Sequence, residues 1–144
     1  MTTEIKIKNL PEGYQSIITN GTHSIVGDEP IKSKGTDLGL APTELVLAGL
    51  AMCKVATVRF IARKKGWELK NVHAELSQEV NRGDKSNLLT SVKVAINIEG
   101  DISDDQKNEL LTQADACYIH RMLDGKWDIE TATELNSTNL IEPS

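Results

Sequence analysis

The sequence predicts an α+β fold with antiparallel sheets, and three observations carry that prediction. Strand patterns occur in consecutive groups instead of alternating with helices, which favours antiparallel over parallel pairing. Asn20-Gly21 lies between two apolar runs, the strongest short-range signal for a β-hairpin. A long apolar helical segment begins at Pro42 and ends before Gly66. The predicted order is βββ–α–ββ–α–β, in a single domain over residues 1–144.

The first three strands are expected at residues 4–9, 14–19 and 23–26, as an antiparallel meander. Residues 27–40 are rich in Gly, Asp, Lys and Pro, so they are expected to form a loop. The helix that follows is apolar around nearly its whole circumference between Leu45 and Ala62. A helix of this kind is normally buried on most of its sides.

The second half of the chain predicts another hairpin, a helix and a last strand. Apolar residues alternate over residues 69–80 and 88–98, on either side of a polar loop at residues 81–86. Ser103 with Gln106 forms a capping box, and helical spacing continues through Cys117 to the neighbourhood of Asp124. Trp127–Leu135 is expected to form the final strand.

Composition limits the classes of function. The net charge is −5 and the pI about 5.2, which argues against a protein that binds nucleic acid or an anionic membrane, because such a protein would need a basic face. The N-terminus alternates apolar and charged residues and lacks the apolar core of a signal peptide. Lys54 and Arg59 interrupt the longest apolar stretch, which argues against a membrane span. We therefore expect a cytoplasmic protein, whose thiols are kept reduced.

The two cysteines are the principal candidates for chemistry. A reduced, buried cysteine is often only a small core residue. Here Lys54 adjoins Cys53, while His120 and Arg121 follow Cys117 at i+3 and i+4 and can share a helical face with it. Such cations increase the thiolate fraction of a nearby cysteine. One thiol could be oxidised to a sulfenic acid and the other resolve it as a disulfide, if their Cα atoms lie within roughly 7 Å.

Two other chemistries fit the sequence less well. Cys117, His120 and Cys53 could form a metal site, but zinc ligands usually occur in tighter pairs or with a second histidine. A hydrolase would need a nucleophile-elbow motif or a serine framed by glycines, and the sequence has neither. We therefore predict neither a metal nor another cofactor.

Two segments that carry the cysteines resemble the OsmC/Ohr family of osmotically induced and organic hydroperoxide resistance proteins. Gly35–Cys53 resembles the family's helix start and the Ala/Gly-x-x-Cys that follows it, and Cys117-Tyr-Ile-His-Arg resembles its Cys-Pro-Val-His-Arg segment. The segments Ile98–Ser103, His23–Pro30 and Lys64–Trp67 also fit, and favour an OsmC-like branch apart from the hydroperoxide reductases proper.

The resemblance implies a fold, an activity and partners. The fold is an intertwined homodimer, in which sheets wrap two long central helices and the cysteines meet at the subunit interface. The activity is thiol-dependent reduction of organic hydroperoxides or peroxides without metal or flavin. Cys53 would be the peroxidatic residue and Cys117 the resolving one. The expected partners are a second copy, a peroxide substrate and a thiol reductant.

The sequence departs from the hydroperoxide reductases at three points. No Arg precedes Arg59, so their loop-borne Arg has no counterpart, and His23 is the nearest cation-capable candidate in that part of the chain. Thr43 stands where the reductases have their Glu, whereas Glu44 matches the wider OsmC-like branch. Tyr118 replaces the Pro of the second motif. The candidate catalytic residues are Cys53, Cys117, Glu44 and His23.

Each supporting residue also has a structural interpretation. Glu44 could act only on the helix dipole, and His23 could be an ordinary strand residue beside the Asn-Gly turn. His120 and Arg121 could cap carbonyl groups at a helix end. At the level of function, the alternative is a non-catalytic OsmC-like dimer that binds a small apolar ligand in its interfacial cleft.

Overall fold

The computed structural model describes residues 2–84 and 87–136, and the chain divides into two compact units. The first unit holds the described residues up to Leu45 and those from Asp128 onward. The second unit runs from Val46 to Trp127. Each unit has its own antiparallel sheet, so the predicted α+β class with antiparallel pairing is confirmed.

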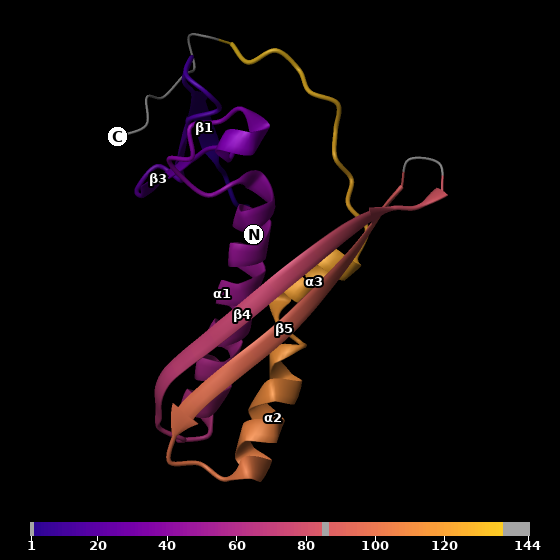
Figure 1. The fold of residues 1–144 in the computed structure, drawn as a ribbon. Coiled ribbons are helices and arrows are strands. Elements are labelled where there is room, and N and C mark those ends of the chain that lie inside the picture. The colour runs from indigo at the N-terminus through magenta and orange to yellow at the C-terminus, as the bar shows by residue number, and fades with distance from the viewer. Residues whose placement is uncertain (1, 85–86, 137–144) are drawn as a thin grey trace. The chain divides into compact units, whose positions relative to one another are not determined.

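The first unit contains a three-stranded meander of β1 (Lys6–Asn9), β2 (Ser16–Thr19) and β3 (Ser24–Gly27), paired in that order (Figure 1). It confirms the predicted meander, with β1 and β2 shorter than expected. Residues 21 and 22 occupy the centre of the hairpin turn, because the Asn20 N–H donates to the His23 carbonyl over 3.2 Å. Gly21 has a φ of +98°, a conformation that glycine adopts without steric cost.

Asp28 organises the loop that follows β3. Its carboxylate accepts hydrogen bonds from the Thr36 hydroxyl and from four backbone N–H groups, those of Tyr14, Glu29, Thr36 and Leu38. The Thr36 hydroxyl is the largest of the influences that lower the pKa of Asp28, which falls to about 2 despite the opposing effect of burial. The side chain is 3% exposed, so the loop closes over an ionised carboxylate.

Helix α1 (Pro42–Lys64) begins and ends as the sequence predicts. Its C-terminus is a Schellman motif, in which the Gly66 N–H donates to Arg63 and the Trp67 N–H to Ala62. Gly66 supplies the left-handed conformation that this motif needs, with a φ of +74°. The chain therefore turns sharply from α1 into the next strand.

Within one chain, α1 buries only one stripe of side chains instead of most of its circumference. The buried residues, at intervals of four, are Leu50, Lys54, Val58 and Ala62. Met52 and Phe60 are 73% and 63% exposed. Among the described helices, α1 alone is long and apolar enough to cross a membrane, with a mean hydropathy of 1.9. Length and composition are weak evidence for a span, because the core helix of a soluble protein meets the same criteria.

The second unit packs helices against a long hairpin of β4 (Leu69–Arg82) and β5 (Leu88–Gly100) (Figure 1). Both strands extend beyond the predicted ranges, and residues 85 and 86 of the predicted loop lie outside the described residues. Helix α2 (Asp104–Ala114) starts at the predicted capping box of Ser103. The core unites α1, β5 and α2 through Val58, Ala62, Ile98, Leu110 and Ala114.

The predicted helix through Asp124 is interrupted. Helix α2 ends at Ala114, and α3 (Tyr118–Asp124) starts anew because Cys117 has an extended backbone, with φ −65° and ψ 149°. The prediction of one continuous helix was therefore wrong. Helical spacing contains no sign that the Cys117 sulfur caps a new helix, which it does by accepting the N–H of His120.

The predicted last strand is also absent from the described structure. Trp127–Leu135 forms neither a helix nor a strand, although apolar and polar residues alternate along much of it. Trp127, Ile129 and Leu135 are 55%, 79% and 70% exposed. An alternating pattern shows that a segment suits a half-buried sheet surface, but a strand also needs a neighbouring strand for its backbone groups.

Candidate thiol site

The two cysteines, 64 positions apart in the sequence, come together within the second unit. Cys53 is half-buried in the middle of α1, and Cys117 is 1% exposed at the corner before α3. Both are free thiols, and they lie close enough for Cys53 to affect the pKa of Cys117. The Ile119 N–H donates to Sγ of Cys53 over 3.4 Å, and the His120 N–H to Sγ of Cys117 over 3.3 Å. The start of α3 thus supplies one backbone donor to each sulfur.

The groups near Cys117 differ from those that helical spacing indicated. The backbone N–H of His120, and not its ring, contacts the sulfur. The Arg121 guanidinium lies over the ring of Tyr118, at 5.9 Å. The expected helical face shared by Cys117, His120 and Arg121 does not form, because Cys117 precedes α3 as its cap.

Burial dominates the acid–base behaviour of Cys117. Desolvation raises the pKa of this thiol above its ordinary value, and the hydrogen bond and charge interaction with Cys53 raise it further. The His120 N–H and the Lys54 ammonium act in the opposite direction. Because the raising effects prevail, Cys117 is held as a neutral thiol near neutral pH, and the nearby cation offsets only part of the cost of ionising it.

Lys54 is a site residue whose position sequence reasoning missed. It is 2% exposed, and its Nζ lies 2.9 Å from Nδ1 of His120, 3.3 Å from the Ala114 carbonyl and 3.6 Å from the Asp115 carboxylate. A lysine ammonium has only donors, so Nδ1 of His120 accepts and its Nε2 faces Asp124 at 3.3 Å. The signal that could have found Lys54 is its place in the buried stripe, four residues after Leu50 and four before Val58.

A cleft of about 470 Å³ adjoins this cluster in the second unit. Helices α1 and α3 and the two strands line it, mostly with aliphatic side chains such as Leu47, Leu50 and Val94. Lys54 and His120 are among its polar lining residues. The cleft therefore offers an apolar ligand a wall that ends at the charged cluster next to the thiols.

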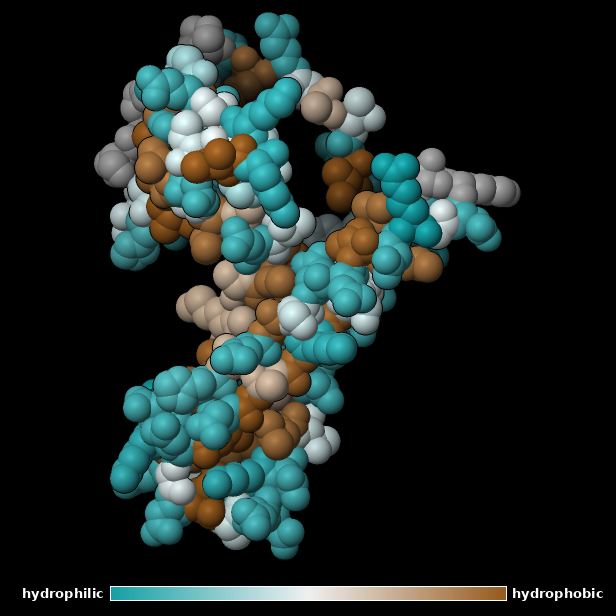
Figure 2. Space-filling view, in the orientation of Figure 1, coloured by the Kyte–Doolittle hydropathy of each residue, from teal (hydrophilic) through white to brown (hydrophobic). Residues whose placement is uncertain are grey.

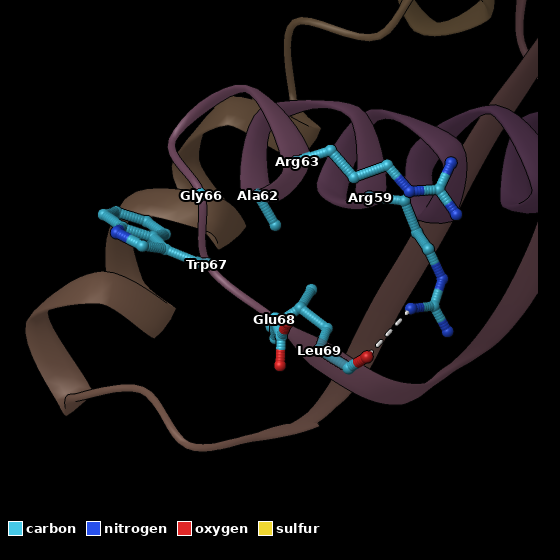
Figure 3. Close-up of a pocket in the computed structure, with 7 residues that line it drawn as sticks. All are labelled: Arg59, Ala62, Arg63, Gly66, Trp67, Glu68 and Leu69. Atoms are coloured by element: carbon cyan, nitrogen blue, oxygen red, sulfur yellow. Dashed lines mark hydrogen bonds between the residues drawn. The ribbon is translucent and has the colours of Figure 1, made fainter.

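A second cavity, of about 440 Å³, lies at the C-terminal end of α1 (Figure 3). The guanidinium of Arg59 extends from the helix to the Leu69 carbonyl, at 3.5 Å, and also donates to the Lys70 carbonyl. Trp67 leaves the helix end with its ring beneath the ammonium of Lys65, at 5.2 Å. These contacts fasten the start of β4 to α1, and we assign this region a structural role.

The other two candidate residues belong to the first unit, whereas both cysteines belong to the second. Glu44 lies in the first turn of α1, where its Oε1 accepts the Ala41 N–H over 2.8 Å. This contact is what a residue that stabilises a helix start would make. His23 is exposed at the end of the first hairpin turn, and its backbone N–H donates to Oδ1 of Asn20. Catalytic roles for Glu44 and His23 stay predictions.

No group of three or more His, Cys, Asp or Glu side chains in residues 2–84 and 87–136 is arranged to hold a metal ion. Cys53, Cys117 and His120 do lie close together, but the ring of His120 is engaged by Lys54 on one nitrogen and by Asp124 on the other. The interactions that the structure shows around the sulfurs are with backbone amides, with each other and with the Lys54 charge.

The chain belongs to the OsmC-like protein family, whose model matches residues 35–132. This range contains α1, both strands of the second hairpin, α2, α3 and both cysteines. A search of curated proteins finds no match. The family is therefore established through most of the chain, including the entire second unit.

Solved structures share the fold at low sequence identity. An OsmC-like protein from Mycoplasma pneumoniae is 18% identical, with a TM-score of 0.74 over 87% of this chain and 89% of that one. An organic hydroperoxide resistance protein OsmC from Legionella pneumophila is 20% identical, with a TM-score of 0.66 over 87% and 90%. An organic hydroperoxide resistance protein from Elizabethkingia anophelis is 14% identical, with a TM-score of 0.66 over 87% and 89%.

Proposed function

We propose that this protein is a cysteine-based peroxidase that reduces organic hydroperoxides or peroxides with two thiols in sequence. The observation that carries the proposal is the meeting of Cys53 and Cys117 within one unit, each with a backbone donor on its sulfur. Family membership and solved relatives described as organic hydroperoxide resistance proteins support a peroxide-related role.

The cycle balances with the two thiols and one peroxide. The Cys53 thiolate attacks the outer oxygen of the hydroperoxide, an S–O bond forms, and the O–O bond breaks to release an alcohol after protonation. The Cys117 thiol then attacks the sulfenic sulfur, forming the disulfide, while the hydroxyl group departs with the thiol proton as water. An external thiol reductant returns both residues to the reduced state.

The environments of the two sulfurs support this assignment of roles. Cys53 is the more accessible residue, and the Ile119 N–H can stabilise negative charge on its sulfur. Cys117 is almost fully buried, and the raised pKa of its thiol disfavours a free thiolate that would attack peroxide first. A buried thiol in contact with its partner is suited to resolution.

The surrounding assignments complete the proposal. Glu44 and His23 would support the reactive thiolate, and the protein would act as a cytoplasmic homodimer. The motivation for Glu44 and His23 is the family resemblance, and the structure shows contacts for both that also suit structural roles. Replacing either residue should change the pH profile of Cys53 alkylation, and unchanged profiles would assign both to the fold alone.

The decisive experiment treats the reduced protein with one equivalent of cumene hydroperoxide. We expect the free-thiol count to fall from two to zero and the intact mass to fall by two hydrogens. The matched control is the double variant Cys53→Ser, Cys117→Ser under the same conditions, which should not react. If the thiols of the native protein oxidise no faster than a free thiol in solution, the peroxidase proposal is wrong.

One observation favours a second function, the non-catalytic binding of a small apolar ligand. The cleft beside Lys54 has aliphatic walls and a volume of about 470 Å³, within the usual range of ligand sites. Under this alternative, an apolar fluorescent probe should bind to the native protein but not to the Leu50→Asp variant. The cysteines should remain inert to peroxide. Rapid oxidation of both thiols would favour the peroxidase.

A further inference from the structure

We propose that Lys54 is the positioning residue of the resolving thiol: it holds the corner that presents Cys117 to Cys53. Lys54 follows Cys53 directly in sequence, so an effect on Cys53 is the simpler expectation. In the structure, however, its side chain contacts Ala114, Asp115 and His120. This inference rests on the proposed two-thiol function, and it adds a residue that the resemblance does not include.

The Ala114 carbonyl is the first group through which Lys54 acts on Cys117. This oxygen accepts the Cys117 N–H over 3.4 Å and Nζ of Lys54 over 3.3 Å. Ala114 is the last residue of α2, where carbonyl groups lack helical partners. Lys54 therefore stabilises the end of α2 and, through the shared carbonyl, the backbone position of Cys117.

His120 is the second group through which Lys54 acts on Cys117. Its backbone N–H donates to Sγ of Cys117, while its ring accepts from Lys54 at 2.9 Å. The ring's other nitrogen faces Asp124 one helical turn later, at 3.3 Å. Lys54 thus fixes the residue that supplies the hydrogen bond to the Cys117 sulfur. The Ala114 carbonyl and His120, which both position Cys117, therefore both bind the Lys54 ammonium.

The charges around Lys54 explain how it can influence Cys117. The titratable groups facing the cluster are Asp115 at the end of α2, His120 and Asp124 on α3, and the two thiols. Asp115 and Asp124 are 77% and 78% exposed, so solvent screens their charges. The buried ammonium keeps more of its effect, and its charge favours ionisation of Cys117.

The consequence concerns the second chemical step. Resolution requires the Cys117 sulfur to displace hydroxide from the sulfenic acid of Cys53, with the thiol proton leaving in the water formed. A cation that favours partial negative charge on Cys117 speeds this step, while the first step on Cys53 proceeds without it. Loss of Lys54 should therefore slow the formation of the disulfide without slowing the oxidation of Cys53.

The test measures iodoacetamide alkylation of Cys117 against pH in a Cys53→Ser background, which needs no peroxide. We expect Lys54→Met to move the midpoint upward by roughly one pH unit and Lys54→Arg to restore most of the shift. Lys64→Met, an exposed lysine in the last turn of the same helix, should leave the midpoint unchanged. A midpoint unaffected by Lys54→Met, or a shift confined to Cys53 in a Cys117→Ser background, would overturn the proposal.

A peroxide experiment separates this inference from the proposed function. In Lys54→Met with both cysteines present, the sulfenic acid on Cys53 should form at the native rate, while the disulfide should form about tenfold more slowly. Equal slowing of both steps would contradict a role on Cys117. If no variant reacts with peroxide, the peroxidase proposal fails and the alkylation result still decides the role of Lys54.

A measurement on the native lysine covers the case in which Lys54→Met does not fold. In the Cys53→Ser protein, the NMR signal of the Lys54 side chain should shift as Cys117 titrates. In the Cys117→Ser protein, that response should disappear. A Lys54 signal indifferent to the state of Cys117 in the first protein would overturn the proposal.

Discussion

The backbone N–H of Ile119 donates to the sulfur of Cys53 over 3.4 Å, and it links the second residue of α3 to the middle of α1. A helix start has N–H groups without helical acceptors, so a sulfur placed there finds a donor. The adjacent N–H of His120 serves Cys117 in the same way. The break between α2 and α3 therefore creates the place where the two thiols meet.

The thiols should divide the work unequally. With Cys117→Ser, one equivalent of organic hydroperoxide should still oxidise Cys53, and the product should stop at a sulfenic acid that dimedone traps. With Cys53→Ser, Cys117 should remain a free thiol at the same dose, because it is buried and its pKa is raised. Mass spectrometry of the labelled peptides checks both outcomes. Trapping on Cys117 with Cys53 still reduced would reverse the roles.

The core of the second unit should be sensitive to loss of volume at Leu110. This residue of α2 is fully buried in the core that α2 forms with α1 and β5. Leu110→Ala should therefore lower the free energy of unfolding by about 2–5 kcal/mol. Urea denaturation followed by circular dichroism measures the change. Leu111→Ala is the matched control, and it should cost clearly less because Leu111 is already 38% exposed. Equal losses would mean that the core is not centred on Leu110.

Asp28 should make stability depend on pH in the acid range. The pKa of its carboxyl falls from 3.8 to about 2 on folding, so ionised Asp28 stabilises the fold above about pH 4 and progressively loses this effect as the pH falls toward 2. Asp28→Asn should therefore be less stable than the native protein near neutral pH. The difference should narrow as the solution is acidified.

Urea midpoints measured near pH 7 and near pH 3 test this dependence. The control is Asp37→Asn, an exposed aspartate of the same loop, which should not change the acid dependence. A constant difference between Asp28→Asn and the native protein at both pH values would show that the carboxylate's charge is not what holds the loop.

The protein should be a dimer in solution. One chain leaves large apolar side chains of α1 exposed, among them Val46, Met52 and Phe60, and apolar residues reach the surface over the second unit in Figure 2. Large apolar side chains exposed along one helix favour an interface with a partner. Light scattering should give about twice the chain mass of 15.8 kDa. A monomer at micromolar concentration would contradict the dimer, and Phe60→Glu should weaken association more than Glu68→Lys.

Local signals accounted for much of the fold. The Asn-Gly hairpin, the capping box at Ser103 and the helix end at Gly66 all form where the sequence predicts them. Each depends on residues within a few positions of one another, and the side-chain chemistry of such motifs is readable from sequence. The α+β class followed from the order of these elements.

The corner at residues 115–117 could not be predicted in the same way. The Ala114 carbonyl is held by Lys54, which lies 60 positions earlier, and helical spacing contains no information about that contact. Sequence reasoning therefore found Cys53, Cys117 and the cations near them but placed Cys117 inside a helix. The last strand failed for a related reason, because its alternating pattern does not reveal whether a neighbouring strand is available.

The consecutive amides of Ile119 and His120 have a practical consequence for observing the chemistry. Each N–H belongs to a different sulfur, Ile119 to Cys53 and His120 to Cys117. Oxidation of Cys53 alone should thus disturb the first amide resonance before the second, whereas disulfide formation should disturb both. Two neighbouring cross-peaks in a nitrogen–proton spectrum would then record which sulfur has reacted, in real time and without any label attached to either cysteine.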